Sequence, residues 1–128
     1  MSIESVAAVL FAIMCLLVIG FQLGLALGAP WGAAAMGGRY PGRFPTPMRV
    51  AAVVQAVVIA LLALVVLADA GLVGPPLGDD APLLIWVPVA VSTISVLLNA
   101  STRSVTERRL WLPVAIVMLV SSLVVALS

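Results

Sequence analysis

Apolar residues form four long runs along the chain, separated by short segments that hold most of the polar and charged residues. The runs cover about residues 5–28, 48–68, 83–100 and 109–127. An α-helix needs about 20 apolar residues to cross the ~30 Å hydrocarbon core of a bilayer. The pattern therefore predicts an all-α, polytopic membrane protein with four transmembrane helices.

Composition supports this prediction for the whole chain. Of the 128 residues, 64% are hydrophobic and only 9% are charged, and the mean hydropathy is +1.32.

The first run is too long for a signal peptide and is preceded by Glu4 rather than by basic residues, so it is expected to be a retained helix. Ser104 and Glu107 have the spacing of a capping box, which places the start of the fourth helix near residue 105. Residues 1–128 are thus predicted to form a single transmembrane domain, with helices at about 5–28, 48–68, 83–100 and 105–127.

The distribution of charge predicts how the chain is threaded. All six basic residues are arginines, and they lie in or beside two connections: Arg39, Arg43, Arg49, Arg103, Arg108 and Arg109. The connection between the second and third runs carries aspartates and no basic residue. The positive-inside rule therefore predicts two hairpins with both arginine-bearing connections in the cytoplasm and both termini external. The dominance of alanine, valine, leucine and arginine suggests a bacterial source, hence a bacterial inner membrane.

Small residues recur on one stripe of each of the first two helices. The predicted helix-packing residues are Gly20, Gly24, Gly28, Ala52, Ala56 and Ala60. Helices in membranes approach closely where side chains are small, as in a glycine zipper. Two interpretations remain open: packing of these helices within one chain, and a subunit interface. Gln22 points about 200° away from Gly20 and Gly24 around the helix, so the first helix is expected to need partners on two faces.

Polar residues inside the apolar runs form a second candidate set. Gln22 and Gln55 are predicted to lie at one depth, where an interhelical hydrogen bond would satisfy amides that lipid cannot. Ser92, Ser95 and Asn99 share one face of the third helix, with Ser95 near the same depth. The cluster is either packing between helices or the polar lining of a path for a solute.

The first cytoplasmic loop, about residues 29–46, is expected to lie at the membrane interface. Its predicted contacts with lipid headgroups are Trp31, Arg39, Tyr40 and Arg43. Amphipathic rings and arginines concentrate at that depth. Anchoring explains these residues without a ligand, and a specific site for a lipid or a partner is the alternative.

Several kinds of chemistry have no support in the sequence. The chain has no histidine and one cysteine, Cys15, so no metal site, cofactor or acid–base pair is predicted. A basic nucleic-acid-binding face is also missing. Glu107 is assigned to the cytoplasmic end of the fourth helix, so no acidic residue is expected in the middle of the membrane. Proton-coupled transporters and small multidrug transporters require such a residue, and these classes are therefore not predicted.

The segments "GAPWG…GGR…R" and "ERRLW.P" resemble those of uncharacterised four-span proteins of bacterial membranes. This resemblance implies no activity. The function predicted first is a non-enzymatic inner-membrane protein that acts through helix–helix assembly, as a homo-oligomer or as a subunit of a larger complex, with membrane lipids as further partners. The alternative is a small uncoupled channel or carrier lined by the intramembrane polar residues. A membrane enzyme that acts on a lipid ranks third.

Overall fold

A computed structural model describes residues 1–74 and 82–128. All the regular secondary structure within those residues is helical. The helices are α1 (Ile3–Ala26), α2 (Thr46–Asp69), α3 (Trp86–Ser101) and α4 (Val105–Ala126), with two short 3-10 helices, η1 (Gly32–Ala34) and η2 (Met36–Gly38), between α1 and α2. The predicted all-α class and the four helices are confirmed. Most of the acidic connection between the second and third apolar runs, including Asp79 and Asp80, lies outside the described residues.

Three of the four helices are long and apolar enough to cross a membrane. These are α1 and α2, with 24 residues each, and α4, with 22 residues. The helix α3 has only 16 residues and is therefore about 24 Å long at 1.5 Å per residue. It begins at Trp86 rather than near residue 83, and Leu83 and Leu84 form a turn before it, accepting bonds from the N–H groups of Trp86 and Val87.

Local capping explains where the helices begin and end. Ser2 caps α1 by accepting a 3.1 Å hydrogen bond from the Ser5 N–H, and Ser104 caps α4 by accepting a 3.1 Å bond from the Glu107 N–H. Gly28, with φ of +96°, follows the last turn of α1 in the left-handed region that glycine adopts most easily. The second helix begins at Thr46, with Pro47 in its first turn, where a missing N–H costs no helical bond.

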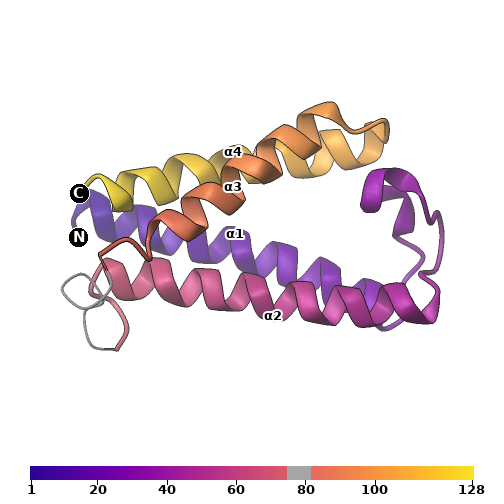
Figure 1. Ribbon diagram of the computed structural model, residues 1–128, viewed down its shortest axis with the longest axis horizontal. Coiled ribbons are helices and arrows are strands. Elements are labelled where there is room, and N and C mark those ends of the chain that lie inside the picture. The colour runs from indigo at the N-terminus through magenta and orange to yellow at the C-terminus, as the bar shows by residue number, and fades with distance from the viewer. Residues whose placement is uncertain (75–81) are drawn as a thin grey trace.

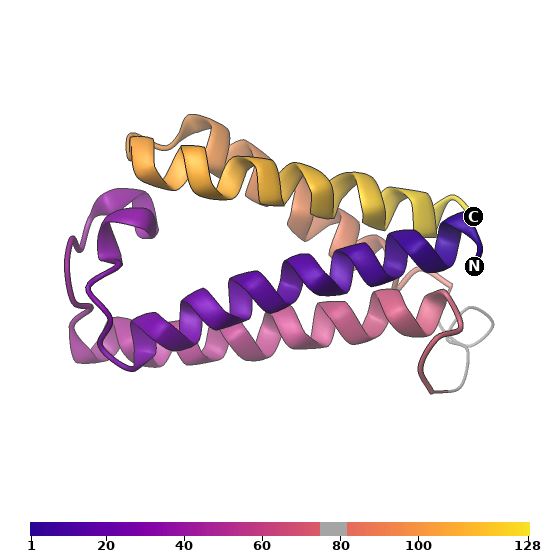
Figure 2. The same ribbon diagram turned by 180° about the vertical axis from the view of Figure 1, so that it is seen from behind.

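The helices form two antiparallel pairs. Figures 1 and 2 show α1 beside α2, and α3 beside α4, with α1 also lying against α4. Both termini, the last turn of α2 and the first turn of α3 lie at one end of the molecule, here called the terminal end. The connections 27–45 and 102–104, with the six arginines in or next to them, lie at the other end, here called the loop end.

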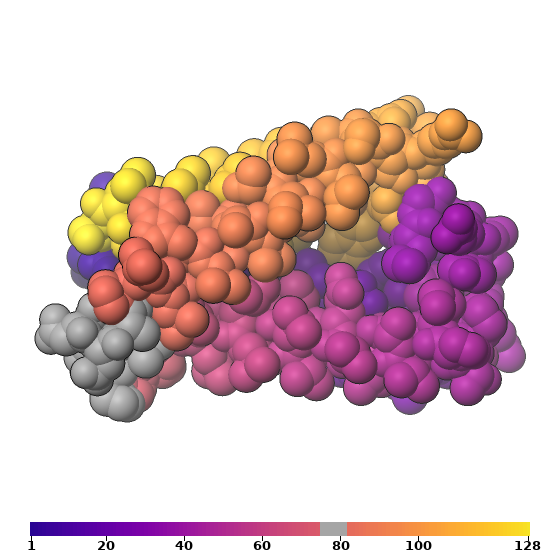
Figure 3. Space-filling view, in the orientation of Figure 1, coloured from indigo at the N-terminus to yellow at the C-terminus, as the bar shows by residue number. Residues whose placement is uncertain are grey.

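The main apolar core fills the terminal half of the molecule. Its fully buried side chains come from three helices: Phe11 and Cys15 from α1, Val66 from α2 and Val125 from α4. A smaller cluster at the loop end joins Leu25 and Ala52 to the first loop. Between α2 and α3 contact is sparse, and Figure 3 shows the molecule hollowed between these two helices toward the loop end. The core therefore holds the two pairs together at one end and leaves space between them at the other.

Candidate functional site: a polar cavity toward the loop end

A cavity of about 640 Å³ occupies the space between the two helix pairs. All four helices and the first loop contribute to its walls. Its polar lining consists of Gln22, Gln55, Ser92, Ser95, Ser101, Asn99, Thr102, Arg103 and Glu107. Each of the five residues expected in a polar cluster, Gln22, Gln55, Ser92, Ser95 and Asn99, thus lies on this one cavity. A volume of 300–1,000 Å³ is typical of pockets that bind small molecules.

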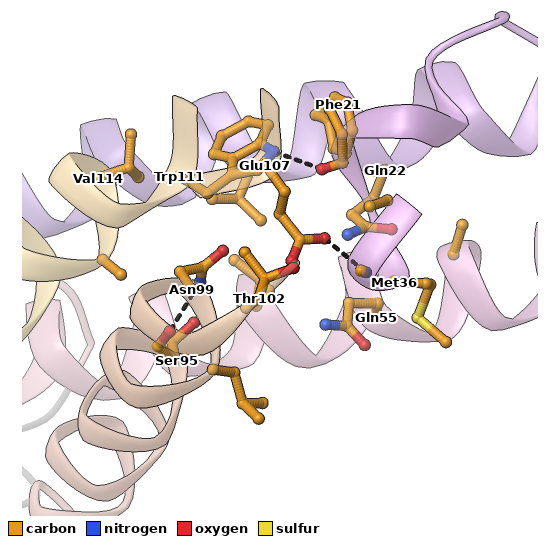
Figure 4. A pocket seen from close by; sticks show the side chains of 18 of the residues that line it. Phe21, Gln22, Met36, Gln55, Ser95, Asn99, Thr102, Glu107, Trp111 and Val114 are labelled. Atoms are coloured by element: carbon orange, nitrogen blue, oxygen red, sulfur yellow. Dashed lines mark hydrogen bonds between the residues drawn. The ribbon is translucent and has the colours of Figure 1, made fainter. Parts of the chain in front are cut away.

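The two glutamines reach the cavity from neighbouring helices. Gln22 of α1 and Gln55 of α2 both line it, and Figure 4 shows their amides on the same side of the space. The hydrogen bond that the sequence predicts between them is not formed among the described residues. Both side chains line the cavity, Gln22 half-buried and Gln55 exposed at its open side. The two amides therefore keep their hydrogen-bonding capacity for whatever enters the cavity.

The polar face of α3 forms the opposite wall. Asn99 donates a 2.7 Å hydrogen bond from Nδ2 to the carbonyl oxygen of Ser95, which leaves its own Oδ1 as an acceptor. Ser92 lies deeper in the cavity, is 1% exposed, and its Oγ has no hydrogen-bond partner within the described chain. The side chain of Ser92 forms part of the deep wall of the cavity.

Glu107 brings a carboxylate into the cavity. Its side chain is 9% exposed, and its Oε2 accepts a 3.0 Å hydrogen bond from the Gly37 N–H of the first loop. Arg103 also lines the cavity, whereas Arg108 and Arg49 bond to backbone carbonyl oxygens. Arg108 donates to the carbonyl oxygen of Thr102 at 3.0 Å, and Arg49 donates to that of Phe44 at 2.8 Å.

Sequence reasoning missed this role of Glu107. The capping-box interpretation is half correct, because Ser104 caps the helix. The Ser104 N–H, however, donates to Thr102 Oγ1 at 3.2 Å, and the Glu107 carboxylate turns into the cavity. One feature could have indicated the site: Glu107 is the single acidic residue near the six arginines.

The first loop closes the loop end of the cavity by binding to the start of α4. Ser104 Oγ donates to the carbonyl oxygen of Ala33 at 2.6 Å, and Trp111 Nε1 donates to that of Ala34 at 3.0 Å. Together with the Gly37–Glu107 bond, these contacts fix the loop against α4 over η1 and η2 (Figure 4).

Aromatic rings form the wall between the cavity and the outer surface. Phe21 of α1 and Trp111 of α4 lie 4.7 Å apart between ring centroids, tilted by 58°. Trp31 also stacks on Phe21, with ring centroids 6.0 Å apart and ring planes 8° from parallel. The wall therefore joins the two helix pairs at the loop end, where the main core does not reach.

The glycines of the expected small-residue stripe have three different environments. A Cβ on Gly24 would overlap the ring of Trp31, so this glycine makes room for an indole from the loop. Gly20 has no atom within 4 Å of the position of a Cβ. Gly28 lies beyond the end of α1, beside the guanidinium of Arg49. The alanines of α2 lie inward, with Ala52 and Ala56 buried and Ala60 half-buried.

The residues expected at lipid headgroups lie on the loop end. Trp31, Arg39 and Arg43 are exposed. Tyr40 is half-buried and meets Phe44 edge-on, with centroids 5.9 Å apart.

Comparison of the chain with models of known protein families, with curated proteins and with solved structures gave no match. A functional assignment therefore rests on the sequence and the geometry of this chain.

Proposed function

We propose that this protein is a non-enzymatic, multi-pass protein of the bacterial inner membrane that binds a small solute in the polar cavity and acts as an uncoupled carrier. The observation that carries this proposal is the cavity itself, with amides, hydroxyls and a carboxylate turned into a space of about 640 Å³. The solute-binding interpretation, second in the sequence analysis, thereby becomes the leading one.

The distribution of arginines supports an orientation with the loop end in the cytoplasm. The six arginines lie in or next to the two connections at that end, and positive charge is retained on the cytoplasmic side. In this orientation both termini are external, and the cavity lies in the cytoplasmic half of the membrane. The helix α3 is short, and the turn at Leu83 and Leu84 supplies the rest of its path across the membrane.

The packing of the terminal half favours a carrier over an open channel. Four side chains are fully buried there: Phe11, Cys15, Val66 and Val125. They fill the space between the cavity and the terminal end. A solute can pass only if the two helix pairs move relative to each other. The sparse contact between α2 and α3 supports such a movement.

The chemistry of the lining supports a non-enzymatic role. Among the described residues, Glu107 is the one carboxylate on the cavity wall, and the sequence has no histidine to act as its acid–base partner. Within the described residues, no group of three histidine, cysteine or acidic side chains could hold a metal ion.

Cysteine accessibility tests whether the cavity admits solutes. In a Cys15→Ala background, we expect Ser95→Cys on the cavity wall to react with a small water-soluble methanethiosulfonate applied to the loop-end side of membrane vesicles. Ser121→Cys is the matched control, because Ser121 is 3% exposed and bonds to its own helix at Val117. Equal protection of the two cysteines would contradict an accessible cavity.

A second function, assembly with a second copy or with a larger membrane complex, is favoured by a different observation. A shallow apolar groove runs over α1 and α4 on the surface, and Gly20 lies in it beside Leu16, Trp31 and Leu110. Since nothing lies within 4 Å of a Cβ at Gly20, a larger side chain there would leave the fold of one chain unchanged and obstruct a neighbouring helix.

The oligomeric state in mild detergent tests assembly. If the groove is a subunit interface, Gly20→Ile should shift an oligomer to monomer, whereas Ala100→Ile on the exposed side of α3 should not. A wild-type protein that is strictly monomeric would rule out self-assembly through this groove.

A further inference from the structure

We propose that the solute is an amphipathic amine whose ammonium group binds to the carboxylate of Glu107 and the Oδ1 of Asn99, with its apolar part against the aromatic wall. This inference rests on the proposed solute-binding function and specifies the chemical class of the ligand.

The first step concerns charge. Glu107 is 9% exposed, and its described hydrogen bond is the one that Oε2 accepts from the Gly37 N–H, which leaves Oε1 to accept another. A carboxylate removed from water interacts more strongly with a cation than an exposed one does, because the local dielectric is lower. Arg103 also lines the cavity but is exposed, so water and salt screen its charge more effectively.

The second step concerns hydrogen-bonding capacity. A carboxylate only accepts hydrogen bonds. Asn99 donates one of the two N–H groups of its Nδ2 to the Ser95 carbonyl, and its Oδ1 remains an acceptor. Figure 4 shows the side chains of Asn99 and Glu107 pointing into the same space from α3 and α4. This part of the wall therefore presents acceptors, and a primary ammonium, with three N–H donors and no acceptor, matches them.

The third step concerns the body of the ligand. From Asn99 the cavity extends along α3 to Ser92, seven residues or about 10 Å away at 1.5 Å per residue. Phe21, Val91, Trp111 and Met118 supply apolar walls along it. Ser92 lines the deep end of the cavity, and its Oγ has no hydrogen-bond partner within the described chain.

The test compares three probes of one chain length: hexylammonium, hexanol and hexanoate. Binding to the purified full-length protein in detergent is followed by calorimetry and by the fluorescence of tryptophan, since Trp111 lines the cavity. We expect hexylammonium to bind at least about ten-fold more tightly than hexanol, and hexanoate to bind most weakly. Equal binding of hexylammonium and hexanol, or tightest binding of hexanoate, would overturn the proposal.

The variant E107Q locates the preference. Glutamine keeps an acceptor for the Gly37 N–H and removes the charge, so the affinity for hexylammonium should fall about ten-fold while that for hexanol stays unchanged. Glu4→Gln, at the other end of the molecule, should change neither. A preference for hexylammonium that survives in E107Q would overturn the assignment to Glu107. If E107Q does not fold, the comparison of the three probes on the wild-type protein still decides whether the cavity prefers an ammonium.

Two further measurements separate the alternatives. Displacement of hexylammonium by short-chain phosphatidylethanolamine but not by phosphatidylcholine would identify the ammonium of a lipid headgroup as the ligand. Displacement by neither lipid would point to a free amine, and both results support an ammonium site. If Ser95→Cys is accessible but ammonium is not preferred, the inference about the amine fails and the solute-binding function stands.

Discussion

Gly32 and Gly20 show how one residue type has opposite roles in this chain. Gly32 is buried, and its N–H donates a 2.8 Å hydrogen bond to the carbonyl oxygen of Gly42. A Cβ at Gly32 would overlap the carbonyl oxygen of Tyr40, whereas a Cβ at Gly20 would have no neighbour within 4 Å. Glycine is therefore required at position 32, where the loop packs on itself. It is not required at position 20, on the exposed surface of α1.

We expect Gly32→Ala to destabilise the protein and Gly20→Ala not to. The overlap with backbone at Gly32 should lower the free energy of unfolding by about 1–3 kcal/mol. Gly20→Ala should leave it unchanged or raise it by up to about 1 kcal/mol, because alanine favours the helix. Unfolding in mixed micelles of mild detergent and dodecyl sulfate measures both changes. Equal stability of the two variants would show that the loop does not pack as described.

At the scale of elements, the first loop and the start of α4 form one unit. Ser104 both caps α4 at the Glu107 N–H and donates to the Ala33 carbonyl of the loop. Trp111 and Glu107 bind the same loop at Ala34 and Gly37. The loop therefore depends on α4 for its position, although the bonded residues lie 70 to 77 positions apart along the chain.

Ser104→Ala should cost more stability than Ser101→Ala. The first substitution removes a helix cap and a hydrogen bond to the loop, which together predict a loss of about 1–2.5 kcal/mol. Ser101 bonds to carbonyl groups of its own helix, so its substitution should change stability by at most about 0.5 kcal/mol. The same micelle titration compares the two. A larger loss for Ser101→Ala would contradict attachment of the loop through Ser104.

At the scale of the whole molecule, two helix pairs share a core at the terminal end and enclose a polar cavity toward the loop end. The arginines lie at the loop end and both termini at the other. The charged end and the cavity thus belong to the same half of the molecule. In the proposed orientation that half faces the cytoplasm.

The orientation predicts opposite labelling at the two ends. In a Cys15→Ala background, Ser2→Cys should react with a membrane-impermeant maleimide from outside intact cells. Pro41→Cys should react only in inside-out vesicles. Both positions are exposed, so burial does not limit either reaction. Labelling of both from outside would contradict the proposed threading.

The sequence determined the helices, because each depends on local properties. Continuous apolar runs predicted all four, and the ends differ from the predicted ones by no more than three residues. Ser104 indicated the cap that begins α4. A helix forms from hydrogen bonds between residues four apart, so the sequence nearby is sufficient to predict it.

Only the tertiary structure decided what the polar side chains face. The sequence placed Gln22 and Gln55 at one depth, but the rotation of α1 and α2 about their axes directs both amides into the cavity without a bond between them. It placed Glu107 outside the membrane as part of a cap, but the loop around Gly37 folds over it and encloses the carboxylate. These arrangements depend on contacts between segments far apart in the chain, and no local pattern specifies such contacts.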